Sequence, residues 1–427
     1  MRNLMKFFLI NKHGRGFVNM ENLLHQKDFK NIRLLYLQLG PECNMFCRHC
    51  HQTPEKHLSC ISRNLSDETK QFLEHFIQYS QREEFLSKAK NEKNLFRIMF
   101  YGGEALLHWD ILKELVVFFT EKYNLLSNSV FRFALTTNGL GITKDFVDFV
   151  NKYKVHVSFS YDAPNPWAVR GFVPDSICDL VNQIKTKTII SAGSSYNCDP
   201  VLARRCLQAK FPNAKYITRM EVMRTFPEME EDIDIYNFEK LRSSIRKLCI
   251  LAKMKDKWAV GYLRALISPK LYPDSEWGYF HRTKCGNCIS GRKELTVSTD
   301  GKIYFCYNSG ELLGNLIDDT IDSIYEKAKQ KWVNIYDPQC ETCEGKEFCH
   351  WGCYILLRDK NKHAFTCEQY RKPLFKILQE ELKALGKPLT EEEIAWYREQ
   401  EKLMEQQVQA FLLEGKRYEK EHTRLPK

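Results

Sequence analysis

Three cysteines lie close together in the stretch Cys-Asn-Met-Phe-Cys-Arg-His-Cys, at Cys43, Cys47 and Cys50. Thiolates are soft ligands, and three of them gathered this closely favour an iron–sulfur cluster or zinc. Such sites usually take four ligands, so three cysteines leave one metal position open. An open position is typical of catalytic rather than structural metal sites. We therefore expect metal-dependent chemistry at this cysteine loop.

Eight further cysteines follow in the C-terminal half of the chain. They form a Cys-x2-Cys pair, a single cysteine, a Cys-x2-Cys-x5-Cys-x3-Cys run and a last cysteine: Cys285, Cys288, Cys306, Cys340, Cys343, Cys349, Cys353 and Cys367. Eight thiolates suit two four-iron clusters, and the Cys-x2-Cys pairs also suit zinc knuckles. The other five cysteines fall in loops or on apolar helix faces, where we expect no metal: Cys60, Cys178, Cys198, Cys206 and Cys249.

The cysteine loop follows an apolar run that predicts a buried strand, Ile32–Leu39. From there to about residue 222, apolar runs alternate with amphipathic segments, as they do in βα units. Five more strands are expected, at Phe96–Tyr101, Val130–Thr136, Val155–Tyr161, Thr188–Ser191 and Tyr216–Val222. Six helices are expected, at 66–80, 109–123, 143–153, 176–186, 199–209 and 235–254. Residues 81–94 resemble a charged helix end and a surface loop, and residues 255–284 an irregular, aromatic-rich connection.

Polar and glycine residues follow four successive strands. The first strand leads into the cysteine loop, the second ends in Gly102-Gly103-Glu104, the third is followed by Asn138, and the fourth ends at Ser160. In a parallel β/α barrel the active site lies at the C-terminal ends of the strands. We therefore expect these four motifs to meet at one edge of the sheet.

In order and spacing these motifs resemble those of the radical S-adenosylmethionine (SAM) enzymes, which fold as a partial (β/α)6, TIM-like barrel. The resemblance implies that Cys43, Cys47 and Cys50 hold a [4Fe-4S] cluster whose open iron is chelated by SAM. Two departures are His49, where relatives commonly place an aromatic residue, and Ala163, where the fourth-strand motif usually has glycine.

The resemblance also implies which residues bind SAM. Gly102 and Gly103 would let the backbone approach the methionine moiety, and Glu104 would accept hydrogen bonds from its amino group, a charge-assisted contact. Asn138, Ser160 and Arg170 would hold the ribose and the carboxylate, since a guanidinium grips a carboxylate as a fork. The alternative for Arg170 is an ordinary surface arginine.

A hairpin is predicted at 295–305, where two alternating runs meet at Asp300-Gly301. The spacing of Gly301 and the eight surrounding cysteines resembles the SPASM domain, which carries two auxiliary [4Fe-4S] clusters. The resemblance implies that one cluster is held by Cys285, Cys288, Cys306 and Cys353, and the other by Cys340, Cys343, Cys349 and Cys367. Zinc remains the alternative for these cysteines.

The expected organisation has five parts. They are an N-terminal strand or hairpin extension (1–31), the barrel (32–255), a connection (256–284), the SPASM domain (285–370) and a helical C-terminal tail (371–427). In the tail we expect a helix at Leu374–Leu385 that ends at Gly386. A second helix would open with the capping box Thr390-x-x-Glu393 and close at Gly415.

The resemblance implies a radical oxidoreductase. A reduced cluster would cleave SAM to a 5′-deoxyadenosyl radical, which abstracts hydrogen from a C–H bond. SPASM enzymes most often oxidise or crosslink peptides and proteins, so we expect a maturase of ribosomally made peptides.

A sulfatase-maturing activity is disfavoured, since Tyr307 stands where those relatives have aspartate. The 31 residues before the first strand are too few for a leader-binding domain of about 80 residues. The substrate would be gripped by 258–280 or the C-terminal helices. A small-molecule substrate is the second interpretation.

The composition and the net charge indicate which binding partners and which cellular compartment to expect. The net charge of +10 comes from scattered Lys and Arg, which does not point to nucleic acid, although a zinc-containing nucleic-acid-binding protein is the alternative from another class. No apolar run reaches the ~20 residues needed to span a membrane, and Phe7–Ile10 is too short for a signal peptide. Sixteen cysteines then indicate metal binding in the reducing cytoplasm. A low-potential electron donor such as ferredoxin or flavodoxin would be needed.

Overall fold

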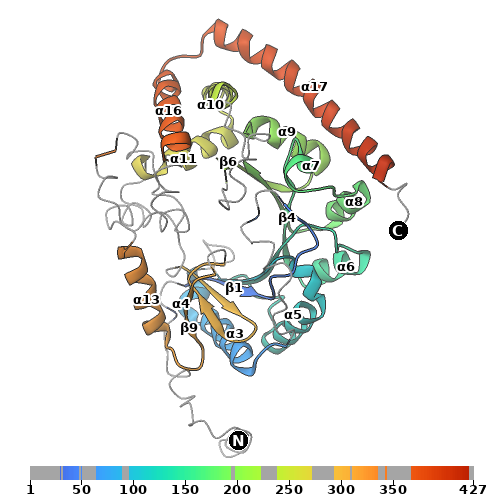
Figure 1. The fold of residues 1–427 in the computed structure, drawn as a ribbon, viewed down its shortest axis with the longest axis vertical. Helices are drawn as coiled ribbons and strands as arrows, with labels where there is room; N and C mark the ends of the chain where they lie inside the picture. Colours follow the sequence, from blue (N-terminus) through green and yellow to red (C-terminus); the bar gives the residue numbers. More distant parts are fainter. Residues whose placement is uncertain are drawn as a thin grey trace, which may run out of the picture.

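One curved sheet organises the chain in the computed structural model. The sheet has nine strands in the order β6-β5-β4-β3-β2-β1-β7-β8-β9. Figure 1 shows it with helices around its convex side, while its concave side, called the inner face below, is turned toward the middle of the molecule. The structure describes residues 29, 32–47, 50, 64–88, 96–193, 198–222, 238–271, 293–307, 310–334, 342–343 and 367–422. The predicted N-terminal hairpin lies outside these ranges.

Six parallel strands confirm the predicted barrel. They follow one another in chain order: β1 (Leu34–Gln38), β2 (Phe96–Tyr101), β3 (Phe131–Thr137), β4 (His156–Ser160), β5 (Lys187–Gly193) and β6 (Lys215–Val222). On β2, the side chains on the convex side, Phe96, Ile98 and Phe100, are fully buried. Their neighbours Arg97 and Tyr101 point to the opposite, inner face and are only half-buried.

The helices on the convex side begin and end within a few residues of the predicted positions. They are α3 (Asp67–Ser80), α5 (Trp109–Tyr123), α6 (Lys144–Lys152), α8 (Asp175–Gln183), α9 (Pro200–Lys210) and α10 (Phe238–Lys253). Short side chains begin several of them. Ser66 Oγ accepts from Thr69 N at 3.2 Å, and Thr143 Oγ1 accepts from Phe146 N at 3.2 Å. Such N-caps satisfy otherwise unpaired backbone donors, which explains why the helices start where they do.

The prediction of a surface loop after α3 was wrong for part of 81–94. Glu83–Lys88 form a short helix, α4, whose Phe85 is buried. The Phe85 ring packs edge-on against Phe96 with centroids 4.8 Å apart, and the Arg33 guanidinium lies 4.8 Å from the Phe85 centroid. One apolar side chain in a charged stretch therefore ties this segment to the core.

The predicted hairpin extends the barrel sheet. β7 (Glu294–Ser298) pairs antiparallel with β8 (Lys302–Tyr304), and β9 (Leu312–Asn315) follows, leading to α13 (Ile321–Asn334). Gly301 at the turn has φ +81°, which favours glycine. β7 also pairs parallel with β1, Leu34 being opposite Glu294. The hairpin therefore continues the sheet next to the strand that carries the cysteine loop. The predicted domain bounds remain predictions.

The prediction of an irregular connection at 255–284 was wrong for Lys257–Leu271, which form helix α11. Asp256 Oδ1 accepts from Ala259 N at 2.8 Å and caps the helix, while Ala259 and Leu263 are buried. The abundance of aromatic residues concealed this helix start. Residues 272–284 lie outside the described residues.

The C-terminal tail packs on the outside of the barrel. α16 (Lys372–Leu385) follows the π-helical segment η5 (Cys367–Arg371) and lies against α10. α17 (Glu391–His422) runs along α9 and α8 (Figure 1). The predicted end of this helix at Gly415 was wrong. Gly415 lies within α17, over the Lys210–Asp175 ion pair of α9 and α8, so the helix continues through the glycine while packed on these two helices. Tyr397, Met404 and Phe411 are buried on the packed side. Among the described residues, no helix is long and apolar enough to cross a membrane.

We expect Glu393→Gln to loosen α17 by removing one charge. Glu393 Oε1 accepts from Lys253 Nζ at 2.7 Å and Oε2 accepts from Thr390 N at 3.1 Å. The Lys253 side chain is 6% exposed. Glutamine can still complete the capping box, so the expected loss of about 1–2 kcal/mol comes from the ion pair. Urea unfolding followed by tryptophan fluorescence would measure it, with the exposed Glu399→Gln as control.

The effect of Glu393→Gln should depend on pH. Burial alone would raise the pKa of Glu393, but the hydrogen bonds from Lys253 and Thr390 lower it. A carboxylate with a depressed pKa stabilises the fold above its unfolded value of about 4.3 and loses this effect as the pH falls through the folded value. The two proteins should therefore differ most near neutral pH and converge below about pH 4. An equal difference at both pH values would contradict this account.

Candidate functional site

The cysteine loop is held against the end of β2 by two glycines. Gly103 N donates to Gly40 O at 2.9 Å, and Glu104 N donates to Glu42 O at 2.7 Å. A Cβ on Gly103 would lie 2.2 Å from Glu42 O, and one on Gly102 would lie 2.4 Å from Gly40 O. Both glycines are therefore required for the close approach of two backbones. Their expected contact with the methionine moiety stays a prediction.

The three thiols of the loop are half-buried and interact with one another. Burial raises the pKa of Cys43, and it raises the pKa of Cys47 to about 12, with the neighbouring thiols adding to both. Thiols in such a setting do not ionise together without a cation, so the donor set fits a cationic iron–sulfur cluster. Among the described residues, no three His, Cys, Asp or Glu side chains are spaced for a single metal ion. A cluster differs in that each cysteine binds its own iron.

Glu104 is fixed behind the loop. It follows Gly103 and begins the short 3-10 helix η1 (Ala105–His108). Its carboxylate is buried and accepts from Thr137 Oγ1 and Asn138 N, each at 2.7 Å, and from Leu106 N at 3.0 Å. Burial raises the pKa of Glu104, and these donors counteract part of that effect. Thr137 was not singled out in the sequence, although it directly precedes Asn138.

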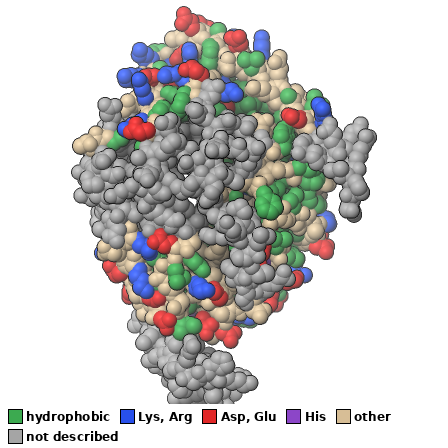
Figure 2. Space-filling model, viewed as in Figure 1, with side chains coloured by type: hydrophobic (Ala, Val, Ile, Leu, Met, Phe, Trp, Pro, Cys, Tyr) green, Lys and Arg blue, Asp and Glu red, His purple; other side chains and the backbone are tan. Residues whose placement is uncertain are grey.

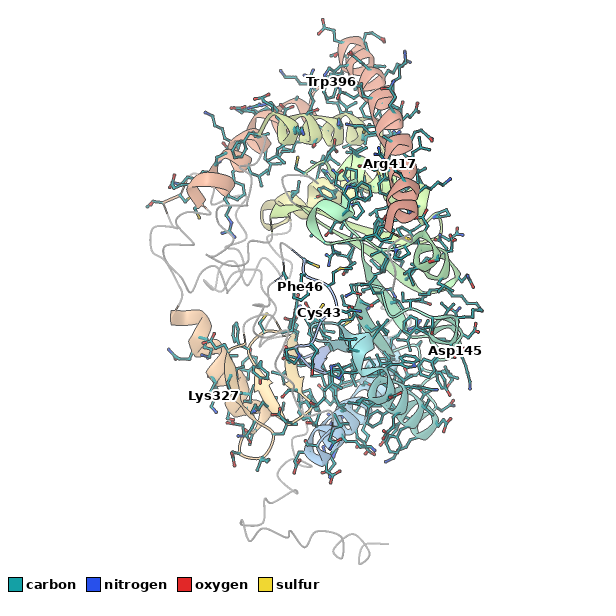
Figure 3. All side chains as sticks on the ribbon, turned by 45° about the vertical axis from the view of Figure 1, so that its right-hand side comes forward. Cys43, Phe46, Asp145, Lys327, Trp396 and Arg417 are labelled. Atoms are coloured by element: carbon teal, nitrogen blue, oxygen red, sulfur yellow. The ribbon has the colours of Figure 1, made fainter. Side chains whose placement is uncertain are left out.

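Asn138 brings the end of β3 to the cysteine loop. Its Nδ2 donates to Asn44 Oδ1 at 2.8 Å and lies 3.8 Å from Cys43 Sγ. Ser160 is buried at the end of β4. In Figure 3, Cys43 and Phe46 lie on the inner side of the sheet, whereas Asp145 of α6 lies on the opposite side. The predicted meeting of strand-end motifs at one edge is therefore observed.

Arg170 is not an ordinary surface arginine. It follows the short helix α7 (Pro166–Val169), and its side chain is 13% exposed. Nε donates to Asp162 Oδ2 at 2.9 Å, and NH1 lies 3.8 Å from Cys47 Sγ. Burial opposes the charge, but Asp162 and Cys47 outweigh it and raise the pKa of Arg170. A permanent positive charge therefore lies beside one of the three thiols, and the grip on a SAM carboxylate stays a prediction.

Three of the eight SPASM cysteines lie in described parts of the chain. Cys306 is buried just after β8. Burial raises the pKa of Cys367, Arg371 opposes this effect, and the nearby Cys343 thiol adds to it. The proximity of Cys343 and Cys367 fits their expected role as ligands of one cluster. The other five lie outside the described residues: Cys285, Cys288, Cys340, Cys349 and Cys353. Cys178, Cys198, Cys206 and Cys249 are buried, and Cys60 lies outside.

Three tyrosines connect the hairpin to the cysteine loop. Tyr307 follows Cys306 and stacks on Tyr36 of β1 with ring centroids 4.2 Å apart. Tyr101, which directly precedes Gly102, packs edge-on against Tyr307 at 4.6 Å. Burial, followed by Tyr36 and Tyr101, raises the pKa of Tyr307 well above its usual value. Tyr307 therefore stays protonated at neutral pH and is unsuited to act as a base.

Comparisons with known proteins agree with this arrangement. The family model described as the radical SAM superfamily matches residues 37–193. The SPASM model, an iron–sulfur cluster-binding domain, matches residues 288–346. Together these matches support iron–sulfur clusters rather than zinc, and an enzyme rather than a nucleic-acid-binding protein.

Individual relatives are distant. The radical SAM cyclopropyl synthase TigE of Paramaledivibacter caminithermalis is 20% identical over 376 residues, covering 82% of this chain and 73% of TigE. The structure of native anSMEcpe with bound AdoMet superposes with a TM-score of 0.56 at 18% identity, covering 83% of this chain and 100% of that one. Native anSMEcpe with AdoMet and the Cp18Cys peptide gives 0.55 at 17% identity, covering 83% and 99%. At this identity the superpositions show a shared fold.

Proposed function

The chain is a radical SAM superfamily enzyme with a C-terminal SPASM domain, using [4Fe-4S] clusters and SAM, and we propose that its substrate is a peptide or protein. The observation that carries the proposal is the inner face of the sheet. On β2, this face carries the half-buried Arg97 and Tyr101 on either side of the buried Met99, so it is only partly covered by other side chains. An extended chain can lie along such a surface.

The residues at the strand ends have separate tasks in this proposal. Cys43, Cys47 and Cys50 hold the cluster, which together with SAM supplies a 5′-deoxyadenosyl radical. Glu104 is held rigidly by Thr137 and the Asn138 backbone, so it is placed to accept from the SAM amino group. Gly102 and Gly103 keep the loop in register with β2.

The remaining SAM contacts and the electron path complete the proposal. Asn138, Ser160 and Arg170 lie around the same edge and would orient the ribose and carboxylate. Two auxiliary clusters on the SPASM cysteines would take up the electron left on the substrate after hydrogen abstraction. A low-potential ferredoxin or flavodoxin would reduce the first cluster.

One of the relatives supports a peptide substrate. The anSMEcpe structure that shares this fold was determined with a bound Cp18Cys peptide. TigE is described as a cyclopropyl synthase, a name that specifies the group formed and not the size of the substrate.

The test is mass spectrometry of peptides encoded beside the gene, co-expressed with the enzyme under anaerobic conditions. Oxidation or crosslinking should lower the mass of one peptide by about two hydrogens, and fragmentation should place the change. The Cys47→Ala enzyme should leave the peptide unchanged. Turnover of a metabolite in cell extract, with every candidate peptide unmodified, would replace the proposal by a small-molecule substrate.

A further inference from the structure

Two arginines lie side by side on the inner face, at the N-terminal ends of their strands and away from the cysteine loop. Arg97 of β2 and Arg132 of β3 are direct register partners in a parallel pair, so their backbones are about 4.8 Å apart. Both alternate with fully or almost fully buried side chains such as Ile98 and Phe133, which face the helices. Both arginine side chains therefore extend from the inner face of the sheet, at the same level on neighbouring strands.

This pair has no internal counter-charge in the described part of the chain. Both side chains are half-buried, and among the described residues neither guanidinium makes a hydrogen bond or an ion pair. Burial lowers the pKa of both; for Arg97 the neighbouring Tyr36 opposes this effect and the charge of Arg132 adds to it. Like charges directly opposite on neighbouring strands are destabilising, and so is a partly buried charge without a partner. A pair of charges that destabilises the fold and makes no stabilising contact within it is typical of a binding site.

Neighbouring strands add donors to the same region. His156 Nε2 lies 3.0 Å from Thr188 Oγ1. Burial and then the charges of Arg97, Lys215 and Arg132 lower the pKa of His156 to about 4. His156 is therefore neutral at neutral pH, and its electrostatic environment is set by three cations from β2, β3 and β6. The donors and cations of this region come from separate strands, so the pairing of the strands fixes their positions relative to one another.

The distance from Arg97 to the cysteine loop indicates which part of a substrate this site would bind. Arg97 is four residues before Tyr101 at the end of β2, a separation of about 13 Å along the strand. About four residues of an extended peptide cover that distance. Guanidinium groups bind planar oxyanions as a fork. We propose that Arg97 and Arg132 form an anion-binding subsite that holds a substrate carboxylate about four residues from the position that reacts.

The assignment to a peptide carboxylate rests on the function proposed above, whereas a phosphate would suit the same chemistry. The test is isothermal titration calorimetry of the anaerobic, full-length holoenzyme. The probes are acetyl-Gly-Glu-Glu-Gly-amide, its neutral counterpart acetyl-Gly-Gln-Gln-Gly-amide, and inorganic phosphate. The variants are Arg97→Gln and Arg132→Gln. The control is Arg82→Gln, which removes an exposed arginine beyond the end of α3.

The wild-type enzyme should bind the glutamate peptide at least about tenfold more tightly than the glutamine peptide. Each of Arg97→Gln and Arg132→Gln should remove most of that preference, and Arg82→Gln should keep it. The variants should fold, because neither guanidinium has a hydrogen bond or ion pair to lose within the described residues. Arg97→Lys and Arg132→Lys, which keep the charge but not the fork, should retain part of the preference.

Two results would overturn the proposal. If phosphate binds in an arginine-dependent manner and the glutamate peptide does not, the carboxylate assignment is wrong. If no probe responds to Arg97 or Arg132, the subsite does not exist. Because binding is measured without turnover, a glutamate preference in an enzyme that modifies no peptide would reject the proposed function and leave the subsite standing.

Discussion

Replacing Cys47 by alanine is expected to abolish the formation of 5′-deoxyadenosine from SAM, with a loss of at least about a thousandfold. Cys47 lies beside both the other thiols of the loop and the Arg170 guanidinium. Under the proposed assignment, its removal takes away one of the three cluster ligands and leaves the cluster without a stable site. The measurement is chromatography of the products after reduction with dithionite under anaerobic conditions.

The matched control is Cys249→Ala. Cys249 is equally a free cysteine, but it is buried in α10 and lies outside the cysteine loop. Its replacement removes a single buried sulfur, and the variant should form 5′-deoxyadenosine at close to the wild-type rate. Cys47→Ala should also contain about four fewer irons per chain. Undiminished product from Cys47→Ala would show that Cys43–Cys50 is not the site of SAM cleavage.

Gly103→Ala is expected to have the second-largest effect, because the added methyl group meets backbone rather than a flexible side chain. Its Cβ would lie 2.2 Å from Glu42 O and 2.3 Å from Pro41 O, so the cysteine loop must move away from β2. A displacement of about 1 Å at a reacting centre costs about a hundredfold in rate. The overpacking should also cost about 1–3 kcal/mol of stability.

Gly261→Ala is the control for this substitution. Gly261 lies in α11 and has nothing within 4 Å of its Cβ position. Alanine there should stabilise the helix by up to about 1 kcal/mol and leave SAM cleavage unchanged. SAM cleavage and thermal unfolding of both variants measure the difference. If Gly103→Ala cleaves SAM as fast as Gly261→Ala, the two glycines do not position the cysteine loop.

Most of the barrel could be predicted because its signals are local. Apolar runs marked the six parallel strands, and capping residues such as Ser66 and Thr143 marked helix starts. Tertiary packing could not be read in the same way. In the charged stretch after α3, the ring contact of Phe85 with Phe96 holds a short helix against the core. α17 continues through Gly415 because it lies along α8 and α9.

The candidate site was predictable in part for the same reason. The order of motifs placed Glu104, Asn138 and Ser160 at one edge of the sheet, and the structure brings Glu104 and Asn138 into contact. The partners within the site were not predictable. Thr137 as a donor to Glu104 and Asp162 as the ion-pair partner of Arg170 depend on side-chain geometry. The pairing of Arg97 with Arg132 depends on the register between strands.

The charge distribution fits an enzyme better than a nucleic-acid-binding protein. In Figure 2, basic and acidic side chains are interspersed among the described residues on that face. Nucleic-acid binding generally requires basic residues to be clustered. The Arg97–Arg132 pair is small by comparison and suits a single anionic group.

The most direct test of the central claim is the metal content of the anaerobically purified protein, measured together with acid-labile sulfide. Three four-iron clusters predict about twelve irons and twelve sulfides per chain, with broad visible absorption that bleaches on reduction. After reduction the same sample should convert SAM to 5′-deoxyadenosine. Two or three zinc ions per chain, with neither iron nor sulfide, would contradict the account.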